Sequence, residues 1–453
     1  MLLNRSEYKL INIFNSILSR YIFLFIFMLL SGLLICLSSN IKLHICGMVL
    51  LCIGAVIASN FDLMHPYCWF SIAFTLYSVS YPIIYLIGFY GNRYGYSGDL
   101  MLLQWIALAV FLVFVSPKKK RKINNFKINK ISTFTEILYI LLYMYICFAI
   151  IGIINGGFAT KGEIYATGNI FYKVAFRAAI MLTVIYAYML VQKCICKSKF
   201  DIKLVILTGL ILCLLTIFSG ERDIGFKYII ITLLIAYRFK YIRNIHIVLL
   251  APLFILLLVL SKKYKYYFLG GSLGVDSITI NNIFYHFLTS EFSSASRNLQ
   301  ILLNHKTFTQ GLFKGFSFIN APLRSFFVDT GSGCVNWFKD TFFESSLIGP
   351  GFTLVGEGYI NIGYLGVILL FIIIAIFIKY LYKKSNENIY WLVIYIYSIP
   401  LYIYAIRADL SNILSPFVKH LLLTIGIIYL FQWSTRYFKA QQENRSIKTN
   451  DRN

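Results

Sequence analysis

Long apolar runs alternate with short polar segments along most of this 453-residue chain. A transmembrane helix needs about 20 consecutive, mostly apolar residues. The pattern therefore predicts an all-α polytopic membrane protein, with a single integral membrane domain over residues 1–453. The twelve predicted spans cover residues 20–38, 43–60, 67–90, 98–116, 134–153, 173–191, 203–219, 225–238, 245–261, 355–378, 389–406 and 413–432.

One connection is much longer than the others. Residues 262–351 separate two predicted spans, whereas turns such as 39–42 and 91–97 are short. Between Ile278 and Leu303, apolar residues recur at spacings of three and four, which predicts one or two amphipathic helices lying on the membrane. Several glycines then mark turns. We expect this segment to form a partly helical cap.

The loop opens with Lys262, Lys263 and Lys265 among tyrosines. These lysines fit either a cluster that snorkels at the membrane interface or a contact with anionic lipid.

The basic residues indicate the orientation of the chain, because cytoplasmic loops retain Lys and Arg. Six short segments hold 25 of the 42 basic residues, and in the twelve-span arrangement all six lie on one side. Both termini are thus expected in the cytoplasm, including a basic tail over 436–453. The first span lacks a small-residue cleavage site and is expected to be retained. Topology and anionic-lipid contact also account for most of the net charge of +24, so nucleic-acid binding is not expected.

The placement of the cysteines and the absence of several known motifs argue against several kinds of chemistry. Most of the nine cysteines lie in or beside predicted spans, and a structural disulfide is not expected. Cys194-Ile195-Cys196 lacks a second ligand pair and is interpreted as a solvated or lipidated loop. The chain has no Walker loop, no His-Glu-x-x-His and no Asp-x-Asp. We expect neither a metal nor a cofactor.

Ionisable residues at membrane depth are costly and mark candidate functional sites. The cluster Ser219–Asp223 has an apolar run on each side, and further charged residues fall near the predicted outer face. Cations outnumber anions there, and the planar fork of arginine suits a diphosphate. The residues are Arg177, Glu221, Arg222, Asp223, Lys227, Arg297, Arg324, Glu357, Arg407, Asp409 and Lys419.

Structural roles are the alternative for several of these residues. Arg222 would then pair with a neighbouring acid and Arg407 with Asp409, Arg177 would snorkel to the interface, and Lys419 would be a counter-ion to Glu357.

Four short motifs, in order, resemble a known family. The stretch Gly356–Gly366 (GEGYINIGYLG) precedes an apolar run and resembles a junction of the Wzy-type O-antigen polymerases, which polymerise oligosaccharide repeat units. Ser219–Arg222, Ala321–Arg324 and Arg407–Leu410 resemble three further family motifs. The chain departs from the family pattern at Ala408, where a glycine is usual, and by one residue in the spacing of Arg324.

The resemblance implies a GT-C-like membrane glycosyltransferase of the bacterial inner membrane, with its active site on the periplasmic side. Such an enzyme transfers a growing glycan from undecaprenyl pyrophosphate to the non-reducing end of a new lipid-linked repeat unit, inverting the anomeric carbon without a metal. The implied partners are undecaprenyl-pyrophosphate-linked oligosaccharide, membrane lipid and a chain-length regulator protein.

The residue roles are expectations based on this resemblance. Glu357 is expected to orient or deprotonate the acceptor hydroxyl, with Asp223 the second candidate. Gly363 and Gly366 are expected to permit close helix packing. Donor pyrophosphate binding and leaving-group stabilisation are assigned to Arg222 and Arg407, supported by Arg177 and Arg324, with Tyr359, Asn361, Arg297 and Lys419 as further substrate-binding candidates.

Two other functions stay open from the sequence. An O-antigen ligase usually presents a histidine base in its large loop, where His286 and His305 are available. A transporter or flippase of lipid-linked oligosaccharide usually shows two similar halves, and no such repeat is detected.

Overall fold

The computed structural model describes residues 17–88, 94–115, 150, 170–196, 199–218, 222–253, 256–257, 286–326, 333–343 and 351–450. Within these ranges the chain forms helices and no strand, which confirms the predicted all-α class. Five helices are long and apolar enough to cross a membrane: Ile41–Ala58, Pro66–Leu86, Gly98–Val115, Leu354–Lys384 and Ser411–Thr435. The total of twelve spans stays a prediction, since spans such as 134–153 fall almost wholly outside the described residues.

The first described helices and α17 (Leu354–Lys384) pack side by side into one bundle. Helix α2 (Ile17–Cys36) packs against α3 (Ile41–Ala58), which packs against α4 (Pro66–Leu86), and α5 (Gly98–Val115) lies along α17. Near the C-terminal ends of α5 and α17, the Lys379 ammonium donates to the Phe114 carbonyl at 3.1 Å.

The second group of helices joins the bundle through α18 (Ile389–Ala405). Helices α8 (Ile170–Cys196), α9 (Lys199–Phe218) and α10 (Arg222–Arg238) pack together, and both α8 and α10 contact α18. The Arg238 guanidinium donates to Asn386 Oδ1 at 2.6 Å. Helix α10 therefore runs antiparallel to α18, and its first residues lie toward the end of α18 that precedes Arg407.

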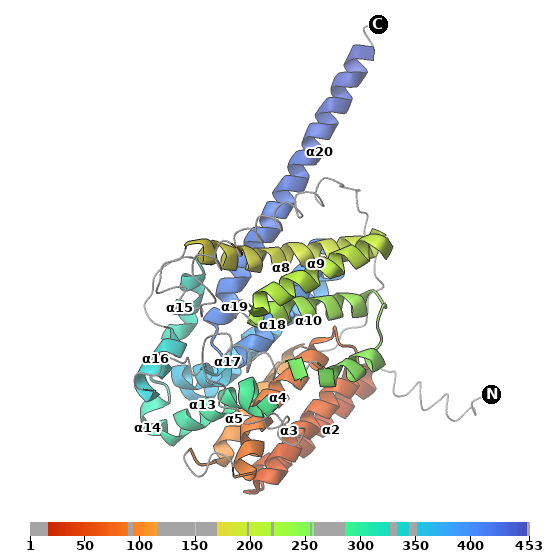
Figure 1. The fold of residues 1–453 in the computed structure, drawn as a ribbon. Coiled ribbons are helices and arrows are strands. Elements are labelled where there is room, and N and C mark those ends of the chain that lie inside the picture. Colours follow the sequence, from red (N-terminus) through yellow and green to blue (C-terminus); the bar gives the residue numbers. More distant parts are fainter. Residues whose placement is uncertain are drawn as a thin grey trace, which may run out of the picture.

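A set of short helices covers one end of this bundle (Figure 1). They are the π-helical turn η1 (Leu288–Phe292), α13 (Ser293–Asn304), α14 (Lys306–Thr309), α15 (Phe316–Ser325) and α16 (Cys334–Phe342). Residues 286–343 are called the cap below, and the bundle end that it covers is called the cap end.

The cap differs from the prediction in one respect. Helix α13 does not lie flat on a membrane surface, because its apolar residues Leu299 and Leu302 are buried and the helix packs against α4. The buried Ser296 hydroxyl contacts the Tyr77 and Ser78 carbonyls of α4 and accepts from Gln104 of α5. The residues predicted to form an interfacial helix thus anchor the cap in the bundle.

The predicted span 355–378 is wrong as a single helix. Ile362 and Gly363 have non-helical dihedrals within α17, with φ 64° and ψ −142° at Gly363. A Cβ on Gly366 would overlap the Gly358 carbonyl, and one on Gly358 would lie 2.7 Å from Val367 Cα. Residues 354–361 therefore fold back on the long apolar helix that follows the break. Gly366 serves close packing as predicted, whereas Gly363 forms the turn.

The last predicted span, 413–432, lies within the candidate membrane span Ser411–Thr435 and contains a π-helical turn. It consists of α19 (Ser411–Pro416), the π-helical turn η2 (Phe417–Leu422) and the first part of α20 (Leu423–Asn450). Helix α20 continues through most of the predicted C-terminal tail and extends away from the bundle (Figure 1).

Candidate active site

The segment before the break in α17 forms a short, capped helix. Thr353 has an extended backbone, and its side chain accepts from the Gly356 N–H, the usual arrangement at a helix N-cap. At the other end, the carbonyls of Tyr359 and Ile360 accept from the backbone N–H groups of the cap loop at Gly311 and Phe313. The cap therefore supplies the hydrogen bonds that a continuing helix would have made.

This helix carries Glu357 into the interior, where its side chain is 1% exposed. The Ser317 hydroxyl donates to Oε1 at 2.7 Å, and the Leu410 N–H donates to Oε2 at 2.6 Å. The Cys334 thiol approaches Oε1 at 3.7 Å. A buried carboxylate needs such donors, because desolvation without them is very unfavourable. Glu357 thus joins α15, α16 and the turn before α19.

Asn361 completes the network around this carboxylate. Its Nδ2 donates to Ser317 Oγ at 2.6 Å and to the Glu357 carbonyl at 2.7 Å, while its Oδ1 accepts from the Ser317 N–H at 3.2 Å. Each polar atom of Asn361 is therefore satisfied. A fully bonded buried network of this kind fixes the positions of its members.

The pKa of the Cys334 thiol is shifted by burial and by the charges near it. Burial raises its pKa, and the nearby carboxylates of Glu357 and Asp409 raise it further. The thiol is thus kept protonated, as a group beside acidic side chains must be.

A cavity of about 390 Å³ opens beside the turn before α19. We call it the Arg324 cavity. Arg324 and Lys419 supply its positive charge, and Asp409 its negative charge. Asp409 Oδ1 accepts from Asn412 Nδ2 at 2.7 Å, and Lys419 lies in the π-helical turn η2. Single π-helical turns inside helices occur frequently at functional sites.

Gly333 lies at one wall of the Arg324 cavity, directly against the Arg324 guanidinium. A Cβ on Gly333 would clash with Arg324 Nη1 and would lie 3.3 Å from Asp409 Oδ2. The guanidinium of Arg324 and the carboxylate of Asp409 are therefore both held close to this backbone position.

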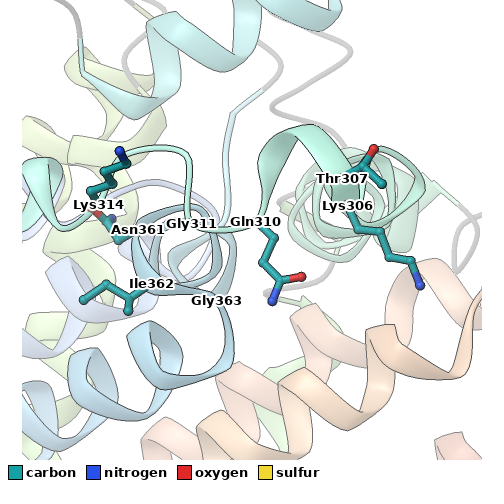
Figure 2. A pocket seen from close by; sticks show the side chains of 8 residues that line it. All are labelled: Lys306, Thr307, Gln310, Gly311, Lys314, Asn361, Ile362 and Gly363. Atoms are coloured by element: carbon teal, nitrogen blue, oxygen red, sulfur yellow. The ribbon is translucent and has the colours of Figure 1, made fainter.

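A second cavity, of about 600 Å³, opens between the cap and the break in α17. We call it the Lys314 cavity. Figure 2 shows Gln310 projecting between the turn that carries Lys306 and Thr307 and the chain at Gly363. Lys314 and Asn361 line the same cavity. Two lysines and several amide or hydroxyl groups thus surround it.

Glu357 connects the walls of the two cavities. On one side, Glu357 bonds to Ser317 and Asn361, and Asn361 lines the Lys314 cavity. On the other side, its partner Leu410 follows Asp409, which lines the Arg324 cavity. The arrangement suits a reaction in which a carboxylate acts between two bound substrates, with cations on either side to hold anionic groups.

Metal binding has no support in the described part of the chain, where no three His, Cys, Asp or Glu residues are grouped as metal ligands would be. Cationic side chains are the electrophilic groups that the described residues offer at these cavities.

Other predicted site residues lie around this centre. The Arg407 guanidinium stacks over the Tyr404 ring at 4.7 Å. Asp223 forms an ion pair of 3.3 Å with Lys227 on α10. Tyr359 is buried, and its hydroxyl donates to Gln310 Oε1 at 3.4 Å.

Arg297 lies on α13, away from both cavities. Its guanidinium donates weakly to the neighbouring Asn298 Oδ1 and lies 5.9 Å from the centre of the Phe343 ring. The side chains of Arg177 and Arg222 lie outside the described part of the structure. Arg222 nevertheless begins α10, whose first turn is at the cap end of the bundle.

The structure therefore brings Glu357 and Asn361 on the short helix, Arg324 on α15 and Lys419 in η2 to the walls of neighbouring cavities, from three separate segments. It also reveals residues that the sequence analysis did not select. Sequence patterns indicate these residues only weakly, because Ser317 bonds to a residue 40 positions away and the two lysines lie among residues typical of turns. These residues are Lys306, Gln310, Lys314, Ser317, Gly333 and Cys334.

Comparison with known proteins supports the resemblance inferred from the motifs. Residues 337–441 match the family described as O-antigen polysaccharide polymerase Wzy. The match includes Glu357, Asn361, Asp409 and Lys419, but not Arg324 or Ser317. A search of curated proteins and a search of solved structures found no match.

Proposed function

We propose that this protein is an O-antigen or related surface polysaccharide polymerase of the bacterial inner membrane. It transfers a growing glycan from undecaprenyl pyrophosphate to the non-reducing end of a new lipid-linked repeat unit. The observation that carries the proposal is the family match over residues 337–441, because this segment contains Glu357 and six of the residues that line the Arg324 cavity, Asp409 and Lys419 among them.

The proposed mechanism uses the two cavities and the carboxylate between them. The donor diphosphate occupies the Arg324 cavity, where Arg324 and Lys419 stabilise negative charge as it leaves. Arg407, in the turn that follows α18, and Arg222, the first residue of α10, are the further residues to which the resemblance assigns diphosphate binding. The proposed enzyme is an inverting glycosyltransferase that needs no metal and works on the periplasmic side.

Glu357 is the proposed general base. Its side chain is 1% exposed, so in the proposed mechanism Ser317, itself 6% exposed, relays the proton from the acceptor hydroxyl to it. The acceptor proton passes to Ser317 Oγ as the Ser317 proton passes to Glu357 Oε1. The acceptor oxygen then forms the new glycosidic bond while the bond to the diphosphate breaks, and the diphosphate keeps the bonding electrons.

The ligase is the less favoured alternative on geometric grounds. Neither His286 nor His305 lines either described cavity, and the His305 ring lies 5.3 Å from the Phe342 ring.

Deletion of the gene in its own strain tests the proposal. We expect lipopolysaccharide capped with a single repeat unit, and restoration of the polymer ladder by the wild-type gene. Arg222→Ala should restore the protein to the membrane without restoring polymer. Bare core with accumulated lipid-linked polymer would instead indicate a ligase. Lengthening of lipid-linked repeat units by the purified protein would exclude a transporter, since only an enzyme lengthens them.

A further inference from the structure

The Lys314 cavity has a lining that suits an anionic ligand. Lys306 and Lys314 contribute two positive charges, and no acidic residue is among the side chains that line it. No aromatic side chain is in the same lining. The cavity therefore lacks the rings on which the neutral, apolar face of a ligand could stack. Charge and hydrogen bonding are therefore the interactions that this cavity offers.

Lys314 has an unusual backbone for a lysine. Its φ is 46°. Two glycines close to it along the chain also have positive φ, 71° at Gly311 and 87° at Gly315. This left-handed region is disfavoured for residues with a Cβ and is tolerated best by glycine and asparagine. Strained residues cluster at functional sites, where the surrounding structure holds them. Lys314 therefore adopts this backbone at a conformational cost, and it lines the cavity.

The cavity also lies next to the proposed general base. Asn361 lines it and bonds both to Ser317, the proposed proton carrier, and to the backbone of Glu357. Under the proposed function, on which this inference rests, a ligand held here is the sugar that carries the reacting hydroxyl. The diphosphate of the acceptor is attached at the other end of its repeat unit, and it is therefore not the anion expected here.

We propose that the Lys314 cavity is the acceptor site and that it recognises an acidic sugar at or near the non-reducing end of the repeat unit. The acidic group is a carboxylate or a phosphate. Lys314 lies next to Asn361 on one side of the cavity and pairs with this acidic group, while Gln310 and Asn361 bind sugar hydroxyl groups. Lys306 lies on the opposite side, beyond Gln310 (Figure 2).

The chemical composition of the polysaccharide made by the source strain gives a direct test. We expect an acidic sugar in the repeat unit, at the residue that becomes linked during polymerisation or next to it. A wholly neutral repeat unit would overturn the inference. That result would leave the polymerase proposal intact, because polymer loss on gene deletion tests that proposal independently.

Kinetics of the purified full-length protein in nanodiscs provide the second test, with lipid-linked repeat units extracted from the deletion strain. Lys314→Asn removes the charge but suits the left-handed backbone. We expect it to raise KM for the repeat unit about tenfold, the effect of losing one charged hydrogen bond. The kcat should change little, and Lys314→Arg should retain most of the affinity.

Lys240 supplies a matched control. It is also a lysine with positive φ, 64°, but it lies at the bundle end opposite the cap. Lys240→Asn should leave KM unchanged, and thermal unfolding should show that neither asparagine variant is less stable than the wild type. If Lys314→Asn is less stable, Lys314→Gly, which also removes the charge and suits the left-handed backbone, replaces it as the deciding variant. A wild-type KM in the deciding variant would overturn the assignment.

Discussion

At the scale of single residues, Glu357 combines two features that rarely occur together without a function. It is buried, and it is an acid whose two oxygens accept from groups on different segments of the chain. Removing a buried acceptor leaves its donors unsatisfied, which costs about 1–3 kcal/mol per group. Stability and activity must therefore be separated when this residue is changed.

Glu357→Gln is the variant that separates them. The glutamine carbonyl can accept from Leu410 N–H, and its amide can donate to Ser317 Oγ. We expect normal amounts of folded protein in the membrane but a loss of polymerisation of about 10²–10⁴-fold, the usual contribution of a general base. Chain-lengthening assays with quantitative immunoblots provide the measurement. Wild-type activity would exclude Glu357 as the base.

Cys334 allows a chemical test of the same region. Its raised pKa means that, at a given pH, the folded protein contains less thiolate than an ordinary cysteine would. Alkylation at pH 8 should therefore be much slower at Cys334 than at the exposed Cys196, and should accelerate once denaturant unfolds the protein. Peptide mass spectrometry after timed iodoacetamide treatment measures both sites. Equal rates in the folded protein would contradict the described burial.

Sequence motifs identified part of this site and missed the rest for a physical reason. Glu357 and Asn361 belong to one short, recognisable stretch, and their bond is local, four residues apart. Ser317 and Lys314 gain their roles only when the cap loop returns to the end of the short helix. Neither residue type nor spacing indicates such a contact in advance.

At the scale of elements, the break in α17 determines where Glu357 lies. Hydropathy predicted a continuous span because residues on both sides of Gly363 are apolar. The break depends on a dihedral pair that only glycine readily adopts, and on N–H groups from the cap that satisfy the freed carbonyls. Neither condition appears in a hydropathy pattern, so the helix was predicted in the correct place but with the wrong shape.

Gly363→Ala tests the importance of this break. The φ of 64° with ψ of −142° is almost restricted to glycine, and a Cβ would lie 3.0 Å from Gln310 Nε2. We expect a loss of about 1–3 kcal/mol in stability and a marked loss of activity. Thermal unfolding in detergent and the chain-lengthening assay provide the measurements.

Gly426→Ala is the matched control, because Gly426 lies within α20 and a Cβ there would meet no atom within 4 Å. Alanine in a helix interior should stabilise the protein by about 0.5–1 kcal/mol. Equal responses of the two variants would show that the backbone at Gly363 is not constrained as described.

At the scale of the whole molecule, the contacts between helices agree with alternating spans. The loop around Phe61 and the segment at Asn244 meet at the end opposite the cap, where Asn244 Nδ2 donates to the Phe61 carbonyl at 3.0 Å. At the cap end, the Ser97 N–H donates to Gln300 Oε1 at 3.1 Å. Both pairings match the sides predicted from the basic residues. Long apolar periodicity predicts the existence and direction of spans well, because every crossing helix must satisfy it.

The orientation of this bundle in the cell is the last prediction, and it decides on which side the proposed chemistry occurs. The cap end should face the periplasm, since the predicted cytoplasmic loops carry the excess of Lys and Arg. Asp340→Cys places a thiol on the exposed surface of the cap, and Glu387→Cys places one at the opposite end. In intact spheroplasts, a membrane-impermeant maleimide should label the Asp340 variant above the wild-type background. The Glu387 variant should be labelled only after lysis. The substitution removes an exposed ion pair with Lys384, and the loss of such a pair costs little stability. The reverse pattern would place both cavities in the cytoplasm and exclude transfer at the periplasmic face.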